Sequence, residues 1–354
     1  MMHTHDNAPQ RLLPEWAEQS AVLLIWPDEQ TDWKPYLAEI RQVYAQMVEA
    51  IARHEQVLLV ARDPAAAREW LSGRVSGKAM EAVRLVQAEY DDTWARDTAP
   101  LTLSDGRDGL RLVNFRFNGW GDKFSARRDN ALNGHLHRQG VFACPMTDAD
   151  DFVLEGGSLE IGDEGILFTT SPCLLAPHRN QPLTQADLQQ RLCAELGVSE
   201  VCWIGHGYLE GDDTDGHIDT LVRCAPGRTL VYVGSGGEDG EQGRELRAME
   251  DDLRAISQRA SAPYRLLRLP MPSPICDDGE RLPATYANFL VINGAVLVPT
   301  YGQPHNDAEA LRVVGEAFPG REIVGIDART VIRQHGSLHC LTMQMPKGTC
   351  QGMA

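Results

Sequence analysis

Residues 219–233, DTLVRCAPGRTLVYV, contain two apolar runs joined by the turn dipeptide Pro226-Gly227. This pattern predicts two antiparallel strands around a tight turn. Apolar residues at three-and-four spacing then predict a helix over Gln242–Arg259, and the run Tyr264–Leu267 predicts a further strand. Together they form a strand–strand–helix–strand module, and the fold depends on whether the rest of the chain repeats it.

The same order of elements recurs along the chain. Helical periodicity marks Lys34–Arg53, Pro64–Ser72, Ser125–Gln139, Gln185–Leu196 and Asp307–Phe318. Short apolar runs follow at Val57–Val60, Val83–Val86, Val141–Ala143, Val201–Ile204 and Ile323–Ile326. Further strand pairs turn at Asp105-Gly106, Gly162-Asp163 and Asn293-Gly294. Thr184 with Asp187, and Asn306 with Glu309, have the spacing of a capping box. The sequence therefore predicts an α/β fold of about five ββαβ-like units.

A side chain capable of chemistry stands just before or at the first strand of each unit. These residues are Asp97, Glu155, His217 with Asp219, Asn288 and Cys340. Units too small to bury their own apolar face must pack against one another. If the units close into a ring, these side chains converge at its centre. The alternative is that they are ordinary residues at strand starts, and the pattern alone leaves both open.

Composition limits the class of protein. The chain has 354 residues, with Lys+Arg 33 and Asp+Glu 50, a formal charge of −17 and a pI near 5.0. We expect a single catalytic domain over residues 1–354, with residues 1–12 as a flexible tail. The negative charge disfavours a nucleic acid or an anionic membrane as partner and suits a small cationic substrate. Self-association into a homo-oligomer is compatible with the sequence.

The N-terminal residues indicate the location of the protein, and the spacing of the cysteines limits the kinds of site that they can form. Met1–Gln10 lacks a basic region followed by an apolar stretch, and no segment reaches the length of a membrane span, so we expect a cytoplasmic protein. The eight cysteines include no C-x-x-C pair, which excludes a ribbon-type zinc site and a thioredoxin-like redox pair.

A thiol, an imidazole and several carboxylates without a metal signature suggest nucleophilic catalysis by cysteine. Cys340 follows His335-Gly-Ser-Leu-His339, although a lone cysteine before a strand is more often structural. In a strand, His217 and Asp219 would share one face. The segment 211–222 does not fit an EF-hand loop, whereas a zinc site from His206, His217 and Asp219 stays open as a minor alternative.

Carboxylates on either side of a planar guanidinium fix its plane and leave the central carbon open to a thiolate. We expect Asp97 and Asp219 to form this clamp and to raise the pKa of Cys340, so that the resting thiol is protonated. His217 is the expected general acid and base, held in position by Glu155.

At these residues the sequence resembles the agmatine deiminases and the bacterial, Porphyromonas-type peptidylarginine deiminases. The resemblance covers nearly the whole chain. Its motifs are Pro14-Glu-Trp16, Ile25-Trp-Pro27, Trp94-Ala-Arg-Asp-Thr-Ala-Pro100, Phe117-Asn-Gly-Trp120, Glu155-Gly-Gly157, Asp215-Gly-His-Ile-Asp219, Tyr286-Ala-Asn-Phe289, Asn293-Gly294 with Pro299, and His339-Cys-x-Thr342 with Gln344. It implies a fivefold pseudosymmetric α/β propeller, the pentein fold.

The resemblance also implies roles for individual residues. By position, Cys340 matches the nucleophile, His217 the general acid and base, and Glu155 its partner acid, while Asp97 and Asp219 match the guanidinium-binding acids. Trp94, Trp120 and Asp213 match positions that line the substrate channel, and Asn288 an asparagine near the active site. Neither a metal nor an organic cofactor is implied.

Two departures from the family pattern bear on the substrate. They are Asp212-Asp-Thr-Asp-Gly216 before the histidine and His335-Gly-Ser-Leu-His339 before the nucleophile. An amine tail would be attracted to Asp213, whereas free arginine would need a basic partner for its carboxylate. We therefore expect deimination of agmatine to N-carbamoylputrescine and ammonia through a cysteine thiouronium. Peptidylarginine or free arginine is the alternative substrate. A metal-dependent hydrolase or a non-catalytic binder of cations is a weaker alternative.

Overall fold

The computed structural model describes residues 10–107, 109–237 and 240–353. Its strands form small mixed sheets. The first contains β1 (Arg11–Leu12), β5 (Leu101–Ser104), β6 (Leu110–Arg116) and β7 (Met146–Val153), and the second contains β8 (Glu160–Ile161), β9 (Ile166–Thr170) and β10 (Glu200–Ile204). The third contains β11 (Val222–Ala225), β12 (Thr229–Val233) and β13 (Arg265–Leu269), and the fourth β16 (Leu290–Ile292), β17 (Ala295–Thr300) and β18 (Glu322–Asp327). The fifth contains β19 (Thr342–Pro346), β2 (Gln19–Ile25), β3 (Gln56–Ala61) and β4 (Val83–Gln87), while β14 (Cys276–Asp277) and β15 (Glu280–Arg281) pair separately.

The helices lie between these strands in the chain. The longer ones are α1 (Leu37–Ile51), α2 (Pro64–Ser72), α6 (Arg127–Arg138), α8 (Gln185–Leu196), α9 (Glu241–Arg259) and α10 (Pro304–Ala317). The short ones are α3 (Gly77–Glu81), α4 (Ala95–Thr98), α5 (Gly119–Asp122) and α7 (Ser171–Leu174). Single turns of 3-10 helix are η1 (Lys34–Tyr36), η2 (Gly156–Ser158), η3 (Asp163–Gly165), η4 (Ile218–Thr220) and η5 (Val331–Gln334). The expected helices are thus confirmed, with ends that shift by a few residues.

One strand arrangement recurs in the five larger sheets. An antiparallel pair is followed by a strand that runs parallel to the second member of the pair, as in β11, β12 and β13. The pairs β5–β6, β8–β9 and β16–β17 are extended in the same way by β7, β10 and β18. The remaining sheet joins the two ends of the chain, because β19 pairs antiparallel with β2 and β3 extends it in parallel. The module predicted from residues 219–267 is therefore the repeated unit.

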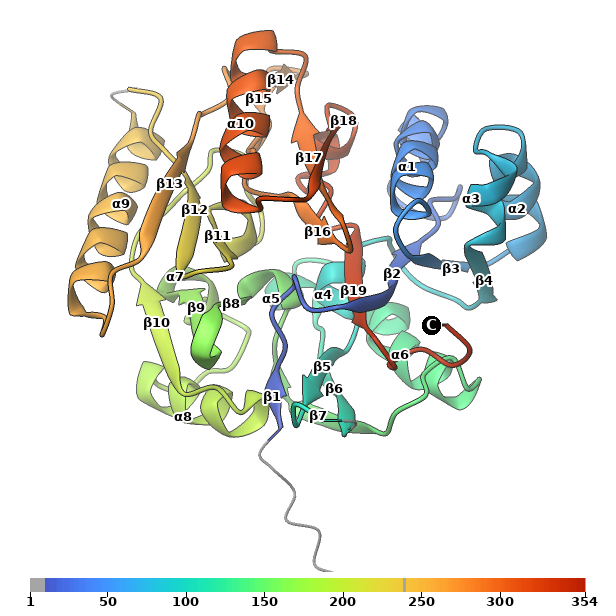
Figure 1. Ribbon diagram of the computed structural model, residues 1–354, viewed down its shortest axis with the longest axis horizontal. Helices are drawn as coiled ribbons and strands as arrows, with labels where there is room; N and C mark the ends of the chain where they lie inside the picture. The colour runs from blue at the N-terminus through green and yellow to red at the C-terminus, as the bar shows by residue number, and fades with distance from the viewer. Residues whose placement is uncertain (1–9, 108, 238–239, 354) are drawn as a thin grey trace, which may run out of the picture.

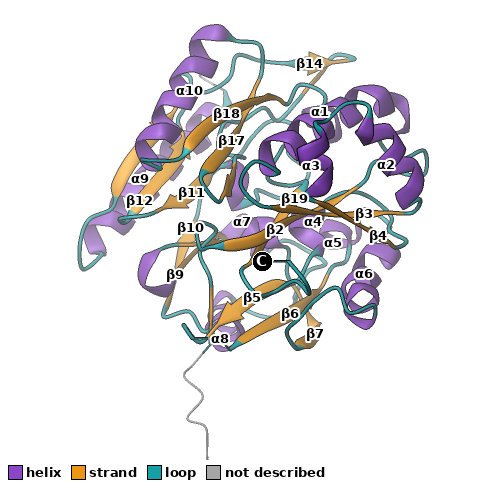
Figure 2. Cartoon of the chain, turned by 45° about the vertical axis from the view of Figure 1, so that its right-hand side comes forward, coloured by secondary structure: helices purple, strands orange, loops and turns teal. Residues whose placement is uncertain are grey.

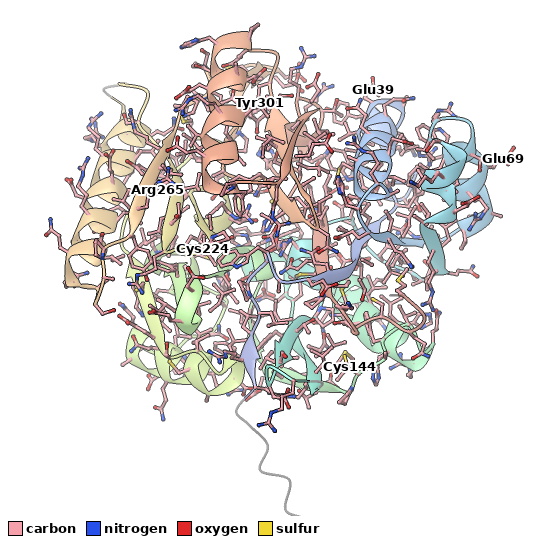
Figure 3. The ribbon with its side chains drawn as sticks, viewed as in Figure 1. Glu39, Glu69, Cys144, Cys224, Arg265 and Tyr301 are labelled. Carbon is pink, nitrogen blue, oxygen red and sulfur yellow. The ribbon has the colours of Figure 1, made fainter. Side chains whose placement is uncertain are left out.

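Apolar side chains place the sheets inside and the helices outside. Every residue of β2, β9 and β12 is buried, as expected for strands covered on both faces. Helices α1, α6, α8, α9 and α10 lie toward the outer edge in Figures 1 and 2, while α4 and β19 lie near the middle. Glu39 of α1 and Glu69 of α2 are exposed, whereas Cys224 and Tyr301 are buried (Figure 3). The first strand of each sheet thus begins in the interior.

Three local predictions are wrong. Arg11 and Leu12 are not part of a tail: they form β1, which pairs with β5, while residues 1–9 lie outside the described residues. Val141–Ala143 forms only an isolated bridge, Phe142 to Cys350, because its backbone bonds to the C-terminal segment, and the strand follows at β7. Asn306 lies inside α10, which begins three residues after Tyr301 with Pro304 and has Gln303 as its N-cap. The capping box at Thr184 is confirmed.

Within the described part of the chain, no helix combines the length and the apolar composition that crossing a bilayer requires.

Gly197 ends α8 in the left-handed conformation, with φ of 62°, and packs against the N-terminal segment. A Cβ at this position would lie 2.0 Å from the Gln10 carbonyl oxygen. Gly197→Ala is therefore expected to lower the free energy of unfolding by about 2–4 kcal/mol, since the left-handed conformation and the clash both cost stability. Urea unfolding measures this. Gly140→Ala is the matched control, because Gly140 has φ of 68° and no atom within 4 Å of its Cβ position. Equal losses in the two variants would contradict the clash.

Candidate active site

Asp97 is held on α4, beside the turn that carries Cys340 and leads into β19. The N–H of the preceding Arg96 donates to the Cys340 carbonyl at 3.1 Å. One carboxylate oxygen of Asp97 accepts from the Gly157 N–H at 2.8 Å, and the other from Trp120 Nε1 at 3.0 Å. Both side-chain oxygens therefore have fixed directions in a buried setting.

His217 is the N-cap of η4 and Asp219 lies within that turn of 3-10 helix, so neither is in a strand and the prediction that they share a strand face is wrong. The cause is local: the Asp212 carboxylate accepts from the Gly216 N–H at 2.8 Å and Thr214 Oγ1 from the His217 N–H at 3.1 Å, which curls the chain. His217 Nδ1 nevertheless lies 3.7 Å from Asp97 Oδ1.

Gly157 stands at the point where these side chains meet. A Cβ on Gly157 would lie 2.6 Å from His217 Nδ1, 2.8 Å from Asp97 Oδ1 and 3.2 Å from Asp219 Oδ2. Only a residue without a side chain fits there, because each of these separations is shorter than van der Waals contact. The structure thus brings the imidazole and both carboxylates around one backbone segment.

Cys340 completes the cluster. Its Sγ lies 3.2 Å from Asn288 Nδ2 and 3.8 Å from Asp219 Oδ2. Asn288 Oδ1 also accepts from the backbone N–H groups of His339 and Cys340 at 3.0 and 3.3 Å. Asn288 therefore fixes the segment that presents the thiol. The structure therefore brings together side chains that precede strands of four different sheets. Asp97 precedes β5, His217 and Asp219 precede β11, Asn288 precedes β16, and Cys340 precedes β19.

The carboxylates set the protonation of the thiol. Burial, then Asp219 and Asp97, raise the pKa of Cys340 well above its ordinary value. Burial also raises the pKa of Asp97, helped by Asp219 and Glu155 against the opposing charge of His217. Burial alone would raise the pKa of Asp219, but the hydrogen bond and charge of His339, with His217 and Arg223, hold it below its ordinary value. The resting site therefore has a neutral thiol beside an ionised Asp219.

The rate at which iodoacetamide modifies Cys340 is expected to rise about tenfold per pH unit from about pH 6 to 9, because the thiolate fraction grows throughout that range when the thiol pKa is high. Peptide mass spectrometry separates this modification from that of the exposed Cys276. A rate that levels off below about pH 8 would contradict the raised pKa.

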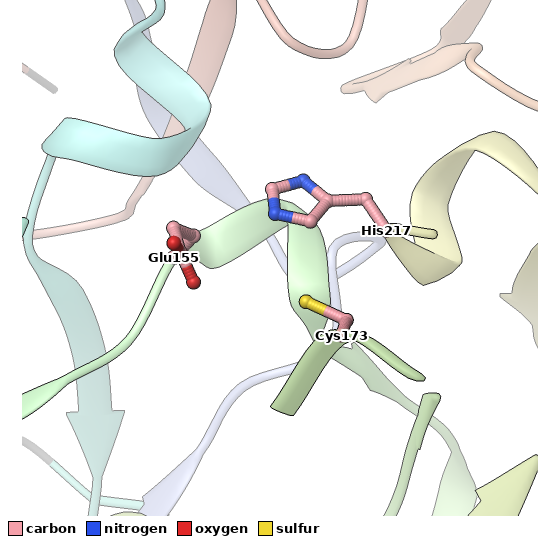
Figure 4. Close-up of side chains that lie close together, drawn as sticks. All are labelled: Glu155, Cys173 and His217. Atoms are coloured by element: carbon pink, nitrogen blue, oxygen red, sulfur yellow. The ribbon is translucent and has the colours of Figure 1, made fainter. Parts of the chain in front are cut away.

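His217 has an unusual environment. Burial disfavours its charged form, but Asp97, Cys173 and Glu155 outweigh burial and raise the pKa of His217 well above its ordinary value. Neither ring nitrogen has a hydrogen-bond partner among the described residues. Cys173 and Glu155 lie beside the ring, as Figure 4 shows. The imidazolium is therefore available to exchange a proton with a bound molecule.

Glu155 is held by an arginine that sequence reasoning missed. Arg179 Nε donates to both Glu155 oxygens, at 3.0 and 3.2 Å, and both side chains are fully buried. Arg179 also donates to Asp215 at 2.6 Å and to the Thr214 carbonyl at 2.9 Å. Arg179 thus connects Glu155 to the turn that carries His217. The available signal was the single arginine in Pro177-His-Arg-Asn-Gln-Pro182.

Among the described residues, two groups of side chains have donor atoms close enough to hold a metal: Glu155 with Cys173 and His217, and Glu15 with Glu160 and His339. In the first group the Arg179 guanidinium binds the carboxylate, and in the second the Arg223 guanidinium donates to both glutamates. A cationic side chain therefore already neutralises each carboxylate set. The alternative zinc ligand His206 is exposed and pairs with Asp252 at 3.0 Å.

A cavity of about 440 Å³ leads from the surface to Cys340 and Asp97. Its acidic lining consists of Asp32, Asp91, Asp92, Asp97, Asp129 and Asp213. No lysine or arginine is among the described residues that line it. Sequence reasoning missed four of these aspartates, although the pair Asp91-Asp92 stands next to the Trp94 motif. The cavity therefore favours a molecule with more than one positive charge.

The predicted channel residues line this cavity. Trp94 donates through Nε1 to Asp92 at 3.2 Å, and its ring packs against Gly336. Trp120 adopts a left-handed backbone conformation, with φ of 57° and ψ of 50°, which is costly for a bulky residue and aims its Nε1 at Asp97. Asp213 is partly buried, and burial followed by Asp212 raises its pKa to about 6.

Comparison with known proteins agrees with this geometry. The family model described as Porphyromonas-type peptidyl-arginine deiminase matches residues 11–346. The chain belongs to this family. It is 33% identical over 363 residues to the agmatine deiminase of Stutzerimonas stutzeri, with 94% of each chain covered.

Solved structures show the same similarity. A Porphyromonas gingivalis protein provisionally assigned as an arginine deiminase has 46% identity and a TM-score of 0.89, covering 97% of this chain and 100% of the other. A cysteine-to-serine variant of C. jejuni agmatine deiminase with substrate bound has 34% identity and a TM-score of 0.88, covering 96% and 97%. The α/β fold of mixed sheets is therefore that of these deiminases.

Proposed function

We propose that this family member hydrolyses agmatine to N-carbamoylputrescine and ammonia. Agmatine carries a guanidinium at one end and an ammonium at the other. The observation that carries the proposal is the cavity that reaches Cys340, because its lining has six aspartates and no lysine or arginine among the described residues. A deep planar cation and an outer amine would both be neutralised there.

Substrate binding begins with the guanidinium between Asp97 and Asp219. Their carboxylates accept its N–H groups and hold its central carbon near Cys340 Sγ. The positive charge favours the thiolate, and the thiol proton is lost to solvent. Sulfur then bonds to the carbon, which gives a neutral tetrahedral adduct.

His217 moves the protons of the later steps. As imidazolium it protonates one NH₂ group, which departs as ammonia with the bonding electron pair and leaves a cationic thiouronium on Cys340. The neutral imidazole then takes a proton from water, whose oxygen bonds to the same carbon. Cleavage of the carbon–sulfur bond, with transfer of the hydroxyl proton of the adduct to the departing sulfur, releases the neutral ureido product and restores the Cys340 thiol. Glu155 stabilises the charged imidazole from behind, and the substituted cysteine of the substrate-bound C. jejuni relative supports the thiol as nucleophile.

Ammonia release from agmatine, free arginine and an arginine-containing peptide tests the substrate directly. We expect turnover of agmatine alone, because an α-carboxylate would meet the aspartates without a basic partner. Turnover of the peptide or of arginine instead would keep the mechanism and replace the substrate. No ammonia release from any of the three compounds would favour a non-catalytic binder of cations. Loss of activity after treatment with a chelator would favour a metal-dependent hydrolase.

Asp213 is the proposed partner of the amine tail. Asp213→Asn is expected to raise the KM for agmatine about tenfold with a smaller change in kcat, since one charge-assisted contact far from the reacting carbon is lost. With the pKa of Asp213 at about 6, the wild-type KM is expected to fall as the pH rises through that value and the carboxylate ionises. Asp122→Asn, at the exposed last residue of α5, is the control. An unchanged KM in Asp213→Asn would place the amine elsewhere.

We also propose that the five sheets are related by fivefold pseudosymmetry, as blades of one propeller around the site, and that the chain is one catalytic domain. The repeated strand arrangement and the pairing of β19 with β2 support this. All eight cysteines are unpaired, which supports a reducing, cytoplasmic location. Self-association stays open to a solution measurement of mass.

A further inference from the structure

Asp219 uses its two carboxylate oxygens differently. Oδ2 lies 2.7 Å from His339 Nδ1 and 3.8 Å from Cys340 Sγ. Oδ1 is buried and has no hydrogen-bond partner among the described residues. An ionised carboxylate only accepts, so the hydrogen between the two side chains belongs to His339 Nδ1. Oδ2 thus contacts both His339 and the thiol, and Oδ1 is a buried acceptor that has no partner among the described residues.

His339 is itself held from its far side. Its Nε2 lies 2.8 Å from Glu15 Oε2 and 3.0 Å from Arg223 Nη2, and the ring is almost fully buried. Rotation of the ring would break contacts at both nitrogens. The imidazole therefore has a single orientation, in which Nδ1 is directed at Asp219.

The groups behind His339 are anchored as well. Arg223 on β11 donates to Glu15, to Glu160 on β8 and to the carbonyls of Ala287 and Phe289. Glu15 also accepts from the Val291 N–H at 2.7 Å. Arg223 and Glu160 are buried, and Glu15 is nearly so. Strands from three sheets, together with the turn that contains Pro14-Glu-Trp16, thus support one imidazole. The proposed chemistry does not otherwise use this motif.

We propose that His339 is a positioning residue for substrate binding: by donating to Oδ2 it fixes Asp219 so that Oδ1 faces the guanidinium, and Glu15 with Arg223 fixes His339. The proposal rests on the proposed function, since it takes a guanidinium as the ligand of Asp219. A buried carboxylate that could rotate would lose this direction, and a displacement of about 1 Å costs a well-placed site up to about a hundredfold in rate.

A matched pair of substitutions tests this role. Asparagine places its NH₂ near the position of the imidazole Nδ1, whereas glutamine places it near Nε2. His339→Asn therefore keeps a donor to Asp219, and His339→Gln keeps only the contact with Glu15 and Arg223. We expect His339→Gln to raise the KM for agmatine on the order of 10- to 100-fold and His339→Asn to raise it only a few-fold. Both are assayed at a temperature where circular dichroism shows them folded.

A purely structural His339 predicts equal losses in the two variants, and that result would overturn the proposal, as would a normal KM in His339→Gln. Glu15→Gln gives a second readout: it weakens the support of His339 without touching Asp219, and it is expected to raise the KM several-fold. An unchanged KM in Glu15→Gln would count against the chain of support. Wild-type protein in the same assay separates the two hypotheses, because absent wild-type turnover contradicts the proposed function alone. Titration of agmatine into Cys340→Ser carrying each His339 variant then tests the positioning role by binding.

Discussion

Replacing Cys340 with serine is expected to reduce ammonia release from agmatine by about 10⁴-fold or more. A serine hydroxyl in the same place would face Asp219 and Asp97, whose negative charges already raise the pKa of the thiol. Among the described residues the candidate base for an alcohol is His217, and it holds its proton at neutral pH, with Nδ1 3.7 Å from Asp97 Oδ1. The guanidinium would still bind, so the loss falls on kcat.

Steady-state kinetics and mass spectrometry measure this effect together. The wild-type protein, quenched during turnover, is expected to carry the thiouronium adduct on the peptide that contains Cys340, and the serine variant no adduct. Cys144→Ser is the control, since Cys144 is also buried but does not line the cavity. Turnover that survives in Cys340→Ser would remove cysteine catalysis from the proposed mechanism.

The elements that follow from local sequence were predictable. The ends of α2 and α8 match their predicted ranges, because Asp63 and Thr184 cap their first turns with side chains nearby in sequence. Strand β7 was missed because Met146–Val153 is largely polar and has no apolar run. Its pairing with β6 depends on the parallel neighbour rather than on its own composition. Strand β1 was also missed, because a strand of two residues is too short to show a periodic pattern.

The site residues also divide into those that local sequence predicts and those that depend on tertiary packing. Residues that precede the first strand of each unit could be picked out, because the repeat places them at equivalent positions. The partners that orient them could not. His339 and Glu15 are 324 residues apart, and Arg179 reaches Glu155 from a loop 24 residues further on. Such contacts depend on how the sheets pack. The turn that leads into the 3-10 helix Ile218–Thr220 depends on hydrogen bonds to Asp212 and Thr214.

Replacing His217 with glutamine is expected to lower kcat for agmatine about 10³-fold and to change KM much less. Glutamine keeps the approximate volume but cannot protonate the leaving nitrogen or accept a proton from water. Because Asp97, Cys173 and Glu155 raise the pKa of His217, the imidazolium persists at neutral pH and is lost only as the pH rises through that raised value. The wild-type rate is therefore expected to decline on the alkaline side, and the residual rate of the variant is expected to lack that decline.

The comparison of the wild type with His217→Gln requires that the role of His217 as a proton donor be separated from any structural role of its ring. Neither ring nitrogen of His217 has a hydrogen-bond partner within the described residues, but Nδ1 lies 3.7 Å from Asp97 Oδ1, so the variant is assayed at a temperature where circular dichroism shows it folded. His206→Gln is the matched control, because His206 is exposed and pairs with Asp252 outside the cavity. If His217→Gln kept both the rate and the alkaline decline, the proton would have to come from Glu155 or Asp97 instead. Arg179 already binds Glu155, and Gly157 and Trp120 donate to Asp97, whereas neither ring nitrogen of His217 has a hydrogen-bond partner among the described residues.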